Sequence, residues 1–163
     1  MNRGLLYRRA VDPILELMRQ GLTPEKIALS LAFGIVLGVF PILGSTTILC
    51  AVAALIFRLN LPAIQLVNYL IYPLQFLLLI PFLRLGEKLF HAAPMRLSVA
   101  QMLAMAHADP SHAIATLWLA GLHAMSAWLL IAPAATLLLY FLLSPALRKI
   151  ADSVGPRDTA KAA

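Results

Sequence analysis

Charge is scarce in this sequence, and its scarcity excludes an ordinary soluble domain. Of 163 residues, 12% are charged and 61% are hydrophobic, whereas a soluble domain carries about 25% charged residues. Three stretches, residues 27–57, 59–83 and 110–147, contain no Asp, Glu, Lys or Arg. Each exceeds the roughly 18 apolar residues that indicate a membrane-crossing helix. The sequence therefore predicts an all-α integral membrane protein with several segments in the bilayer.

Groups that enzymes use for acid–base or metal chemistry are also scarce. The single cysteine, Cys50, excludes an internal disulfide and a cysteine metal site. The apolar stretches hold no carboxylate, and the four histidines lack a carboxylate partner or a metal-ligand spacing. We therefore expect neither catalytic residues nor a metal or other cofactor.

Lysine and arginine outnumber acidic residues by 13 to 7 and lie at the edges of the apolar stretches. There is no basic stripe or binding motif, so no nucleic-acid partner is expected. Five basic residues precede residue 27 and four follow residue 143, which under the positive-inside rule favours two cytoplasmic termini of a multi-pass inner-membrane protein. Both termini on one side require an even number of crossings, so at least one stretch must turn back.

The first apolar stretch has an awkward length for one membrane helix. Residues 27–57 would extend about 46 Å as a helix, against a hydrocarbon core of about 30 Å. Its centre combines a proline, a glycine and three hydroxyl residues, which favour a turn: Pro41, Gly44, Ser45, Thr46 and Thr47. We expect a broken, re-entrant hairpin over residues 23–58. A single tilted helix with a proline kink is the alternative.

Two glycines on the first arm of this hairpin have the spacing of a helix-packing motif. Gly34 and Gly38 form a Gly-x-x-x-Gly pair, which permits close approach of another helix. The pair could join the two arms, join two copies of the chain, or only fill space.

The second stretch also has a proline near its middle. Residues 60–88 begin at Asn60-Leu61-Pro62 and reach Pro73 halfway, so we expect a second broken segment. Polar side chains surround that proline: Asn68, Tyr69, Tyr72 and Gln75. Because an unpaired amide is costly in hydrocarbon, they must face protein or a wet cavity. Asn68 and Gln75 either contact a ligand or hydrogen-bond the backbone that Pro73 frees.

The remaining segments complete a membrane domain that covers residues 23–147. Residues 1–22 read as a basic amphipathic lead at the membrane surface, residues 98–108 as a short interfacial helix, and residues 148–163 as a polar disordered tail. Residues 111–147 form a third membrane segment, either one long kinked helix or a folded pair. Three aromatic residues in it are candidates for the belts at the membrane surfaces: Trp118, Trp128 and Tyr140.

Three motifs carry a resemblance to a known family: Thr23-Pro24-Glu25-Lys26-Ile27-Ala28, Gly34-x-x-x-Gly38-x-x-Pro41-x-x-Gly44-x-Thr46 and Asn60-Leu61-Pro62. Over about residues 20–88 the chain resembles the small bacterial membrane proteins grouped as domain of unknown function 2062. That family usually has Asn-Pro and a hydroxyl residue where this chain has Tyr72-Pro73-Leu74-Gln75. It is distantly similar to the DedA/VTT membrane proteins, which implies re-entrant hairpins and movement of lipids or lipid-linked phosphates.

The hairpin gives a hypothesis for function. Its second arm would begin inside the membrane with free N–H groups and the positive end of a helix dipole, which suit an anion. We expect binding and translocation of a phosphate-bearing lipid or similar anion, with these substrate-binding candidates: Pro41, Gly44, Ser45, Thr46, Thr47, Asn68, Tyr72, Pro73 and Gln75. The alternative is a noncatalytic membrane scaffold or accessory subunit. Membrane lipids are the expected partners, and a homo-oligomer is a further option.

Overall fold

The computed structural model describes residues 22–93, 104 and 107–154. These residues form four α-helices and no strand: α2 (Pro24–Gly38), α3 (Thr46–Phe57), α4 (Leu61–Leu89) and α6 (Pro110–Val154). The all-α class predicted from the sequence is confirmed. The surface lead predicted for residues 1–22 and most of the interfacial helix predicted for residues 98–108 lie outside the described residues.

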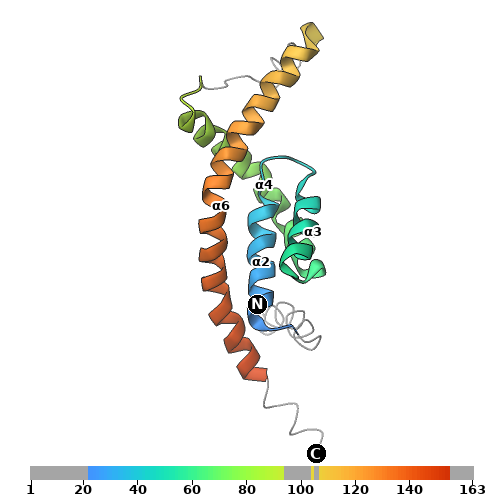
Figure 1. Cartoon of the computed structure of the whole chain (residues 1–163), viewed down its shortest axis with the longest axis vertical. Helices are drawn as coiled ribbons and strands as arrows, with labels where there is room; N and C mark the ends of the chain where they lie inside the picture. Colours follow the sequence, from blue (N-terminus) through green and yellow to red (C-terminus); the bar gives the residue numbers. More distant parts are fainter. Residues whose placement is uncertain (1–21, 94–103, 105–106, 155–163) are drawn as a thin grey trace, which may run out of the picture.

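The first apolar stretch consists of two helices joined by a short irregular segment. α2 begins at a Thr23 cap, whose hydroxyl accepts a hydrogen bond from the Lys26 N–H (3.3 Å). The segment between α2 and α3, residues 39–45, is called the break below. Gly44 in the break has a φ of +83°, a conformation that glycine adopts without strain. α3 then runs back beside α2 (Figure 1), so the alternative of one kinked helix does not hold.

The second apolar stretch is not broken, contrary to the expectation from Pro73. α4 continues through both Pro73 and Pro81. An internal proline removes one N–H donor and bends a helix without having to end it. Pro73 is exposed, while the opposite side of α4 packs against α2 and α6. That packing maintains the helix across a position where local chemistry favours an interruption.

The third apolar stretch is a single helix of 45 residues, with Pro133 and Pro145 inside it. The option of a folded pair is therefore wrong. Disorder from residue 148 is also wrong for residues 148–154, which are helical. Two contacts hold this end: Leu147 is buried against Ile27, and the Arg148 guanidinium donates to the Glu25 carboxylate (2.7 Å). A hydrogen bond from the backbone to the Glu25 carboxylate, together with the hydrogen bond from Arg148, lowers the pKa of Glu25.

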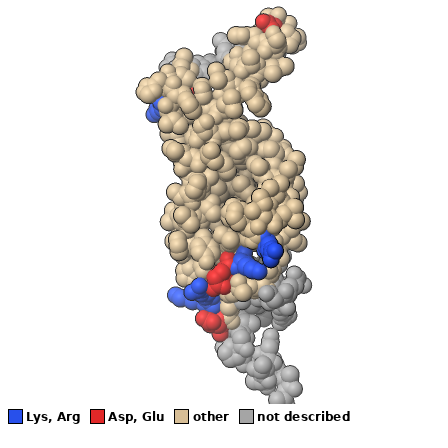
Figure 2. Space-filling view, in the orientation of Figure 1, with Lys and Arg blue, Asp and Glu red and all other residues tan. Residues whose placement is uncertain are grey.

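The helices are arranged around α2, which contacts each of the other three (Figure 1). The start of α2 and the end of α6 lie at the same end of the molecule, while α4 ends and α6 begins at the other. Charged side chains gather toward these two ends, and the surface between them on the face shown is uncharged (Figure 2).

Two helices are long and apolar enough to cross a membrane: α4 and the Pro110–Asp152 part of α6. In each, only 17% of the most apolar window is buried inside the protein. A core helix of a soluble protein would be mostly buried, whereas these helices turn their apolar side chains outward. Large exposed apolar residues also cover α3, where Ile48 and Leu55 are 68% and 77% exposed.

Glycines set the distance between the packed helices. A Cβ on Gly34 would lie 2.9 Å from the Ile64 carbonyl oxygen and 2.9 Å from Val67 Cβ, and one on Gly38 would meet Ile71. The Gly-x-x-x-Gly pair thus packs α2 on α4, a partner different from the options considered from the sequence. Gly86 of α4 has the same function against the backbone of α6 at His123.

Candidate functional site

The break is the candidate site, because it exposes backbone groups within an apolar part of the molecule. The last carbonyls of a helix and the first N–H groups of the next have no partner in their own helix. In hydrocarbon each such group costs several kcal/mol unless another group satisfies it. Side chains from two other helices supply partners at this point.

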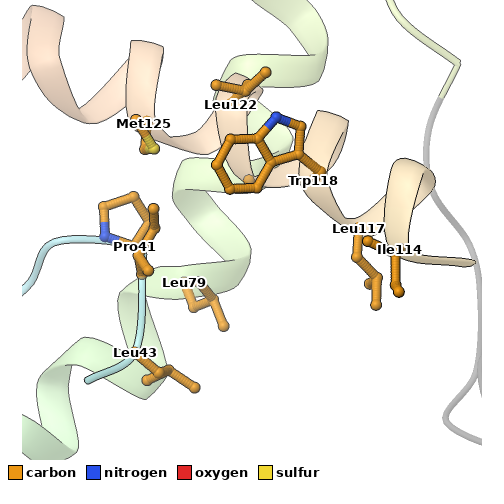
Figure 3. A pocket seen from close by; sticks show the side chains of 10 residues that line it. Pro41, Leu43, Leu79, Ile114, Leu117, Trp118, Leu122 and Met125 are labelled. Carbon is orange, nitrogen blue, oxygen red and sulfur yellow. The ribbon is translucent and has the colours of Figure 1, made fainter. Parts of the chain in front are cut away.

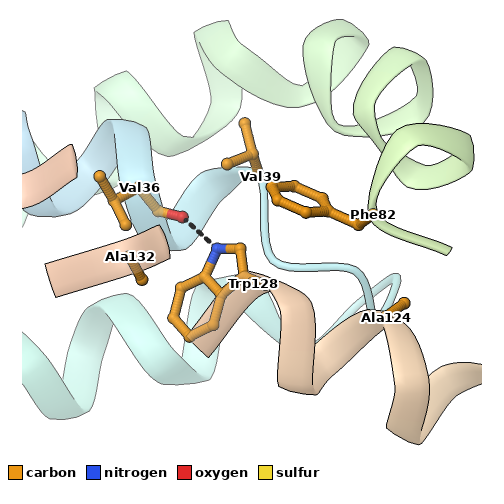
Figure 4. Close-up of a cluster of buried hydrophobic side chains, with 6 residues drawn as sticks. All are labelled: Val36, Val39, Phe82, Ala124, Trp128 and Ala132. Atoms are coloured by element: carbon orange, nitrogen blue, oxygen red, sulfur yellow. Dashed lines mark hydrogen bonds between the residues drawn. The ribbon is translucent and has the colours of Figure 1, made fainter. Parts of the chain in front are cut away.

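Trp128 of α6 provides a hydrogen-bond donor for a backbone carbonyl group near the end of α2. Its indole Nε1 donates a hydrogen bond to the Val36 carbonyl oxygen at 3.0 Å (Figure 4). The ring is 8% exposed and belongs to the core cluster that also contains Val39 and Phe82. Phe40, at the start of the break, meets the indole edge to face at 4.9 Å. The sequence assignment of Trp128 to an aromatic belt is therefore wrong.

Gln75 of α4 provides a hydrogen-bond donor for backbone carbonyl groups of the break. Its side chain is fully buried, and Nε2 donates to the carbonyl oxygens of Phe40 (2.7 Å) and Ile42 (3.5 Å). The Gln75 amide therefore hydrogen-bonds the backbone, which was one of the two roles expected for it. The carbonyl groups that it binds belong to the break, however, and not to the part of α4 around Pro73. Because both contacts use Nε2, this amide group is committed to the protein and is not available to an anion.

Asn68 is buried as well, but it does not lie at the same point as Gln75. Seven residues separate the two on α4, about 10 Å along the helix axis. Asn68 Nδ2 donates to Gln65 Oε1 (3.3 Å). Among the described residues, Asn68 Oδ1 and Gln75 Oε1 have no hydrogen-bond partner. Both are acceptors, so their unmet requirement is for a donor such as water.

Two other candidates from the second stretch are not brought to the break. Tyr72 and Pro73 are exposed, and the Tyr72 ring packs edge to face on Phe76 at 5.2 Å. Their side chains face the surroundings of the protein. The cluster of donors that was expected opposite the hairpin thus contains one residue, Gln75, whose donor is already used.

The beginning of α3 keeps part of the expected character of an anion site. Gly44 is exposed, with open space where a Cβ would lie. The Ser45 hydroxyl donates to the Ile42 carbonyl oxygen (2.8 Å) and does not cap the helix. Thr46 is 2% exposed, while Thr47 is exposed. Gly44, Thr47 and Ile48 are exposed around the start of α3, so the positive dipole end of that helix lies beside Gly44 near the surface.

An apolar cavity of about 400 Å³ adjoins the break. The break contributes Pro41 and Leu43, α4 contributes Leu79, and the first third of α6 contributes Trp118 and Leu122 (Figure 3). No charged side chain lines it. A cavity of this composition suits an alkyl chain and not a charged group.

No metal site occurs in the part of the chain that the structure describes, where no three His, Cys, Asp or Glu side chains are grouped to hold an ion. Sequence reasoning missed Trp128 and Gly86. A signal for Trp128 existed, because it lies near the middle of the third apolar stretch, whereas belt residues lie at the ends of a span. The available sign for Gly86 was that a single glycine, which weakens a helix, stands among large residues in α4.

Comparison with known proteins gives a family and no further relatives. No curated protein and no solved structure matches the chain, so the comparisons lend no support to a similarity with DedA/VTT proteins. One family model, described as an uncharacterized protein conserved in bacteria, matches residues 8–153. This match extends well beyond the motifs of the first two apolar stretches and covers all four helices except the last residue of α6. The chain therefore belongs to the DUF2062 family of bacterial proteins.

Proposed function

We propose that this chain is a multi-pass protein of the bacterial inner membrane that binds a phosphate-bearing lipid at the break and moves it across the bilayer. In this arrangement α4 and α6 cross the membrane, and the α2–α3 hairpin is re-entrant. Both termini then lie on the cytoplasmic side. The transporter-like architecture implied by the resemblance to DedA/VTT proteins is part of this proposal.

The lengths of the helices support the placement. α2 has 15 residues and α3 has 12, about 22 Å and 18 Å at 1.5 Å per residue. Neither spans a hydrocarbon core of about 30 Å. If α2 starts at the cytoplasmic surface, the break lies inside the membrane. The ion pair between Arg148 and Glu25 keeps the end of α6 at that same surface.

The proposal rests on one observation: the break borders an apolar cavity on one side and the N-terminus of α3 on the other. Pro41, Ile42 and Leu43 line the apolar cavity, which fits part of an acyl chain. The N-terminus of α3 follows directly after exposed Gly44, and the positive end of its helix dipole, beside exposed Thr47, suits a phosphate. A lipid has this combination of an apolar chain and an anionic group, and no buried lysine or arginine is needed to hold it.

A transport assay with variants of the break tests this proposal. The purified protein in liposomes is expected to move a fluorescent phospholipid between leaflets. Gly44→Val should abolish most of that flux, because a β-branched residue is strained at a φ of +83° and would shift the start of α3. Thr47→Val should reduce flux by removing an exposed hydroxyl from the first turn of α3.

Gly44→Asn is the matched control, because asparagine tolerates a positive φ better than other non-glycine residues. It should retain most of the flux. Wild-type protein without flux, or Gly44→Val with unchanged flux and correct insertion, contradicts the proposal. The scaffold alternative predicts no flux and a stable protein partner in mild detergent. Since Gly34 and Gly38 are occupied by α4, that pair no longer argues for association between chains.

A further inference from the structure

A second apolar groove lies between α2 and α6, away from the break. Its volume is about 470 Å³, and it shares no lining residue with the cavity beside the break. Leu29, Phe33 and Leu37 of α2 line one side, and Trp128 and Leu137 of α6 line the other. The one hydroxyl in the lining, Thr136, donates to the Ala132 carbonyl oxygen (2.8 Å). The groove thus offers an alkyl chain contact without a competing polar donor.

One end of this groove leads to a basic residue of α2. Lys26 precedes Leu29 by three residues and Phe33 by seven, a spacing that places all three on one face of a helix. Lys26 is exposed, and none of the ion pairs in the described part of the chain includes it. A cation therefore stands one helical turn beyond the last apolar side chain of the groove on α2.

A second basic residue approaches the same end from α3. The Phe57 ring contacts Phe33 of the groove, with ring centroids 4.8 Å apart, and Arg58 follows Phe57 directly. The Asn60 N–H donates to the Ser30 hydroxyl (3.1 Å), which fixes the end of α3 against the first half of α2. Arg58 is exposed and takes part in no ion pair within the described residues.

Glu25, which precedes Lys26 in the sequence, pairs with neither Lys26 nor Arg58. Glu25 is engaged by Arg148 on α6. Figure 2 shows basic and acidic side chains together at this end, below an uncharged surface. A molecule that complements both the apolar groove and the two cations has an alkyl chain with an anionic head group at one end.

We propose that this groove is a binding site for an anionic glycerophospholipid of the cytoplasmic leaflet. One acyl chain lies along Leu29, Phe33 and Leu37, and Lys26 and Arg58 contact the phosphate. The inference rests on the proposed placement in the membrane but not on translocation, since it uses neither the break nor the cavity beside it.

Trp128 lines the groove and can report occupancy by its fluorescence. A Trp118→Phe variant retains Trp128 as its one tryptophan. In phosphatidylcholine vesicles we would compare quenching by acyl-brominated phosphatidylglycerol with quenching by acyl-brominated phosphatidylcholine at equal mole fractions. The anionic lipid should quench Trp128 at a lower mole fraction. Lys26→Gln with Arg58→Gln should reduce that preference by roughly fivefold for each cation removed.

Lys88→Gln is the matched control, since it removes one exposed positive charge at the opposite end of the molecule. It should leave the preference of Trp128 for the anionic lipid unchanged. Equal quenching by the two lipids overturns the proposal, and so does a preference that survives loss of both Lys26 and Arg58 or that falls equally in the control. The quenching experiment measures lipid binding and the liposome experiment measures flux, so one proposal can fail without the other.

Discussion

Gly86→Ala should lower the free energy of unfolding by about 1–3 kcal/mol, even though alanine is the better helix former. The added Cβ would overlap the carbonyl group of His123 on α6. Both contact partners are parts of rigid helices, so α4 and α6 would have to separate where they pack. Thermal or denaturant unfolding of the protein in detergent micelles, followed by circular dichroism, measures the change.

Gly121→Ala on α6 provides the control, because nothing lies within 4 Å of where its Cβ would be. There the helix propensity of alanine should dominate, and the free energy of unfolding should stay equal or rise by up to about 1 kcal/mol. Gly86→Ala is thus expected to lower the free energy of unfolding, whereas Gly121→Ala is not. A stabilised Gly86→Ala protein would show that α4 and α6 do not approach as closely as described.

Trp128→Ala should have the largest effect on stability, about 3–5 kcal/mol. The substitution removes the ring that packs on Phe40 and leaves a cavity among Val39, Phe82 and Ala132. It also leaves the Val36 carbonyl oxygen without its indole donor. Trp128→Phe separates the two contributions, because it keeps an aromatic ring and loses the hydrogen bond, at a cost of about 1–3 kcal/mol.

Trp118→Phe is the comparison for both variants. Trp118 is 65% exposed, and a substitution there should change the free energy of unfolding by no more than about 0.5 kcal/mol. Equal effects at Trp118 and Trp128 would mean that the indole of Trp128 lies at the surface, as the aromatic-belt assignment implied.

Local chemistry made part of the fold predictable. The break follows from Pro41 and Gly44, whose backbone preferences act within a few residues. The starts of α2 and α4 likewise follow from short-range caps at Thr23 and Asn60, with Asn60 Oδ1 accepting from the Ala63 N–H at 2.8 Å. Such features depend on neighbours in sequence, which the sequence displays directly.

Other features depend on contacts between distant residues and could not be derived in this way. Gln75 lies 35 positions from the Phe40 carbonyl that it satisfies, and Trp128 lies 92 positions from Val36. The polar residues around Pro73 suggested one cluster, but the rotation of α4 separates buried Gln75 from exposed Tyr72. At the helical end of α6, Leu147 is buried against Ile27 and Arg148 pairs with Glu25, 123 positions away. The polar sequence of this end gave the opposite expectation.

The central claim is that α2 and α3 form a hairpin that enters and leaves on one side of the membrane, while α4 and α6 cross it. Single cysteines in a Cys50→Ala background, labelled with a membrane-impermeant maleimide from each side, test it most directly. Arg58→Cys and Lys149→Cys should react from the cytoplasmic side and Ala93→Cys from the opposite side. Labelling of Arg58→Cys from the same side as Ala93→Cys would contradict the re-entrant hairpin.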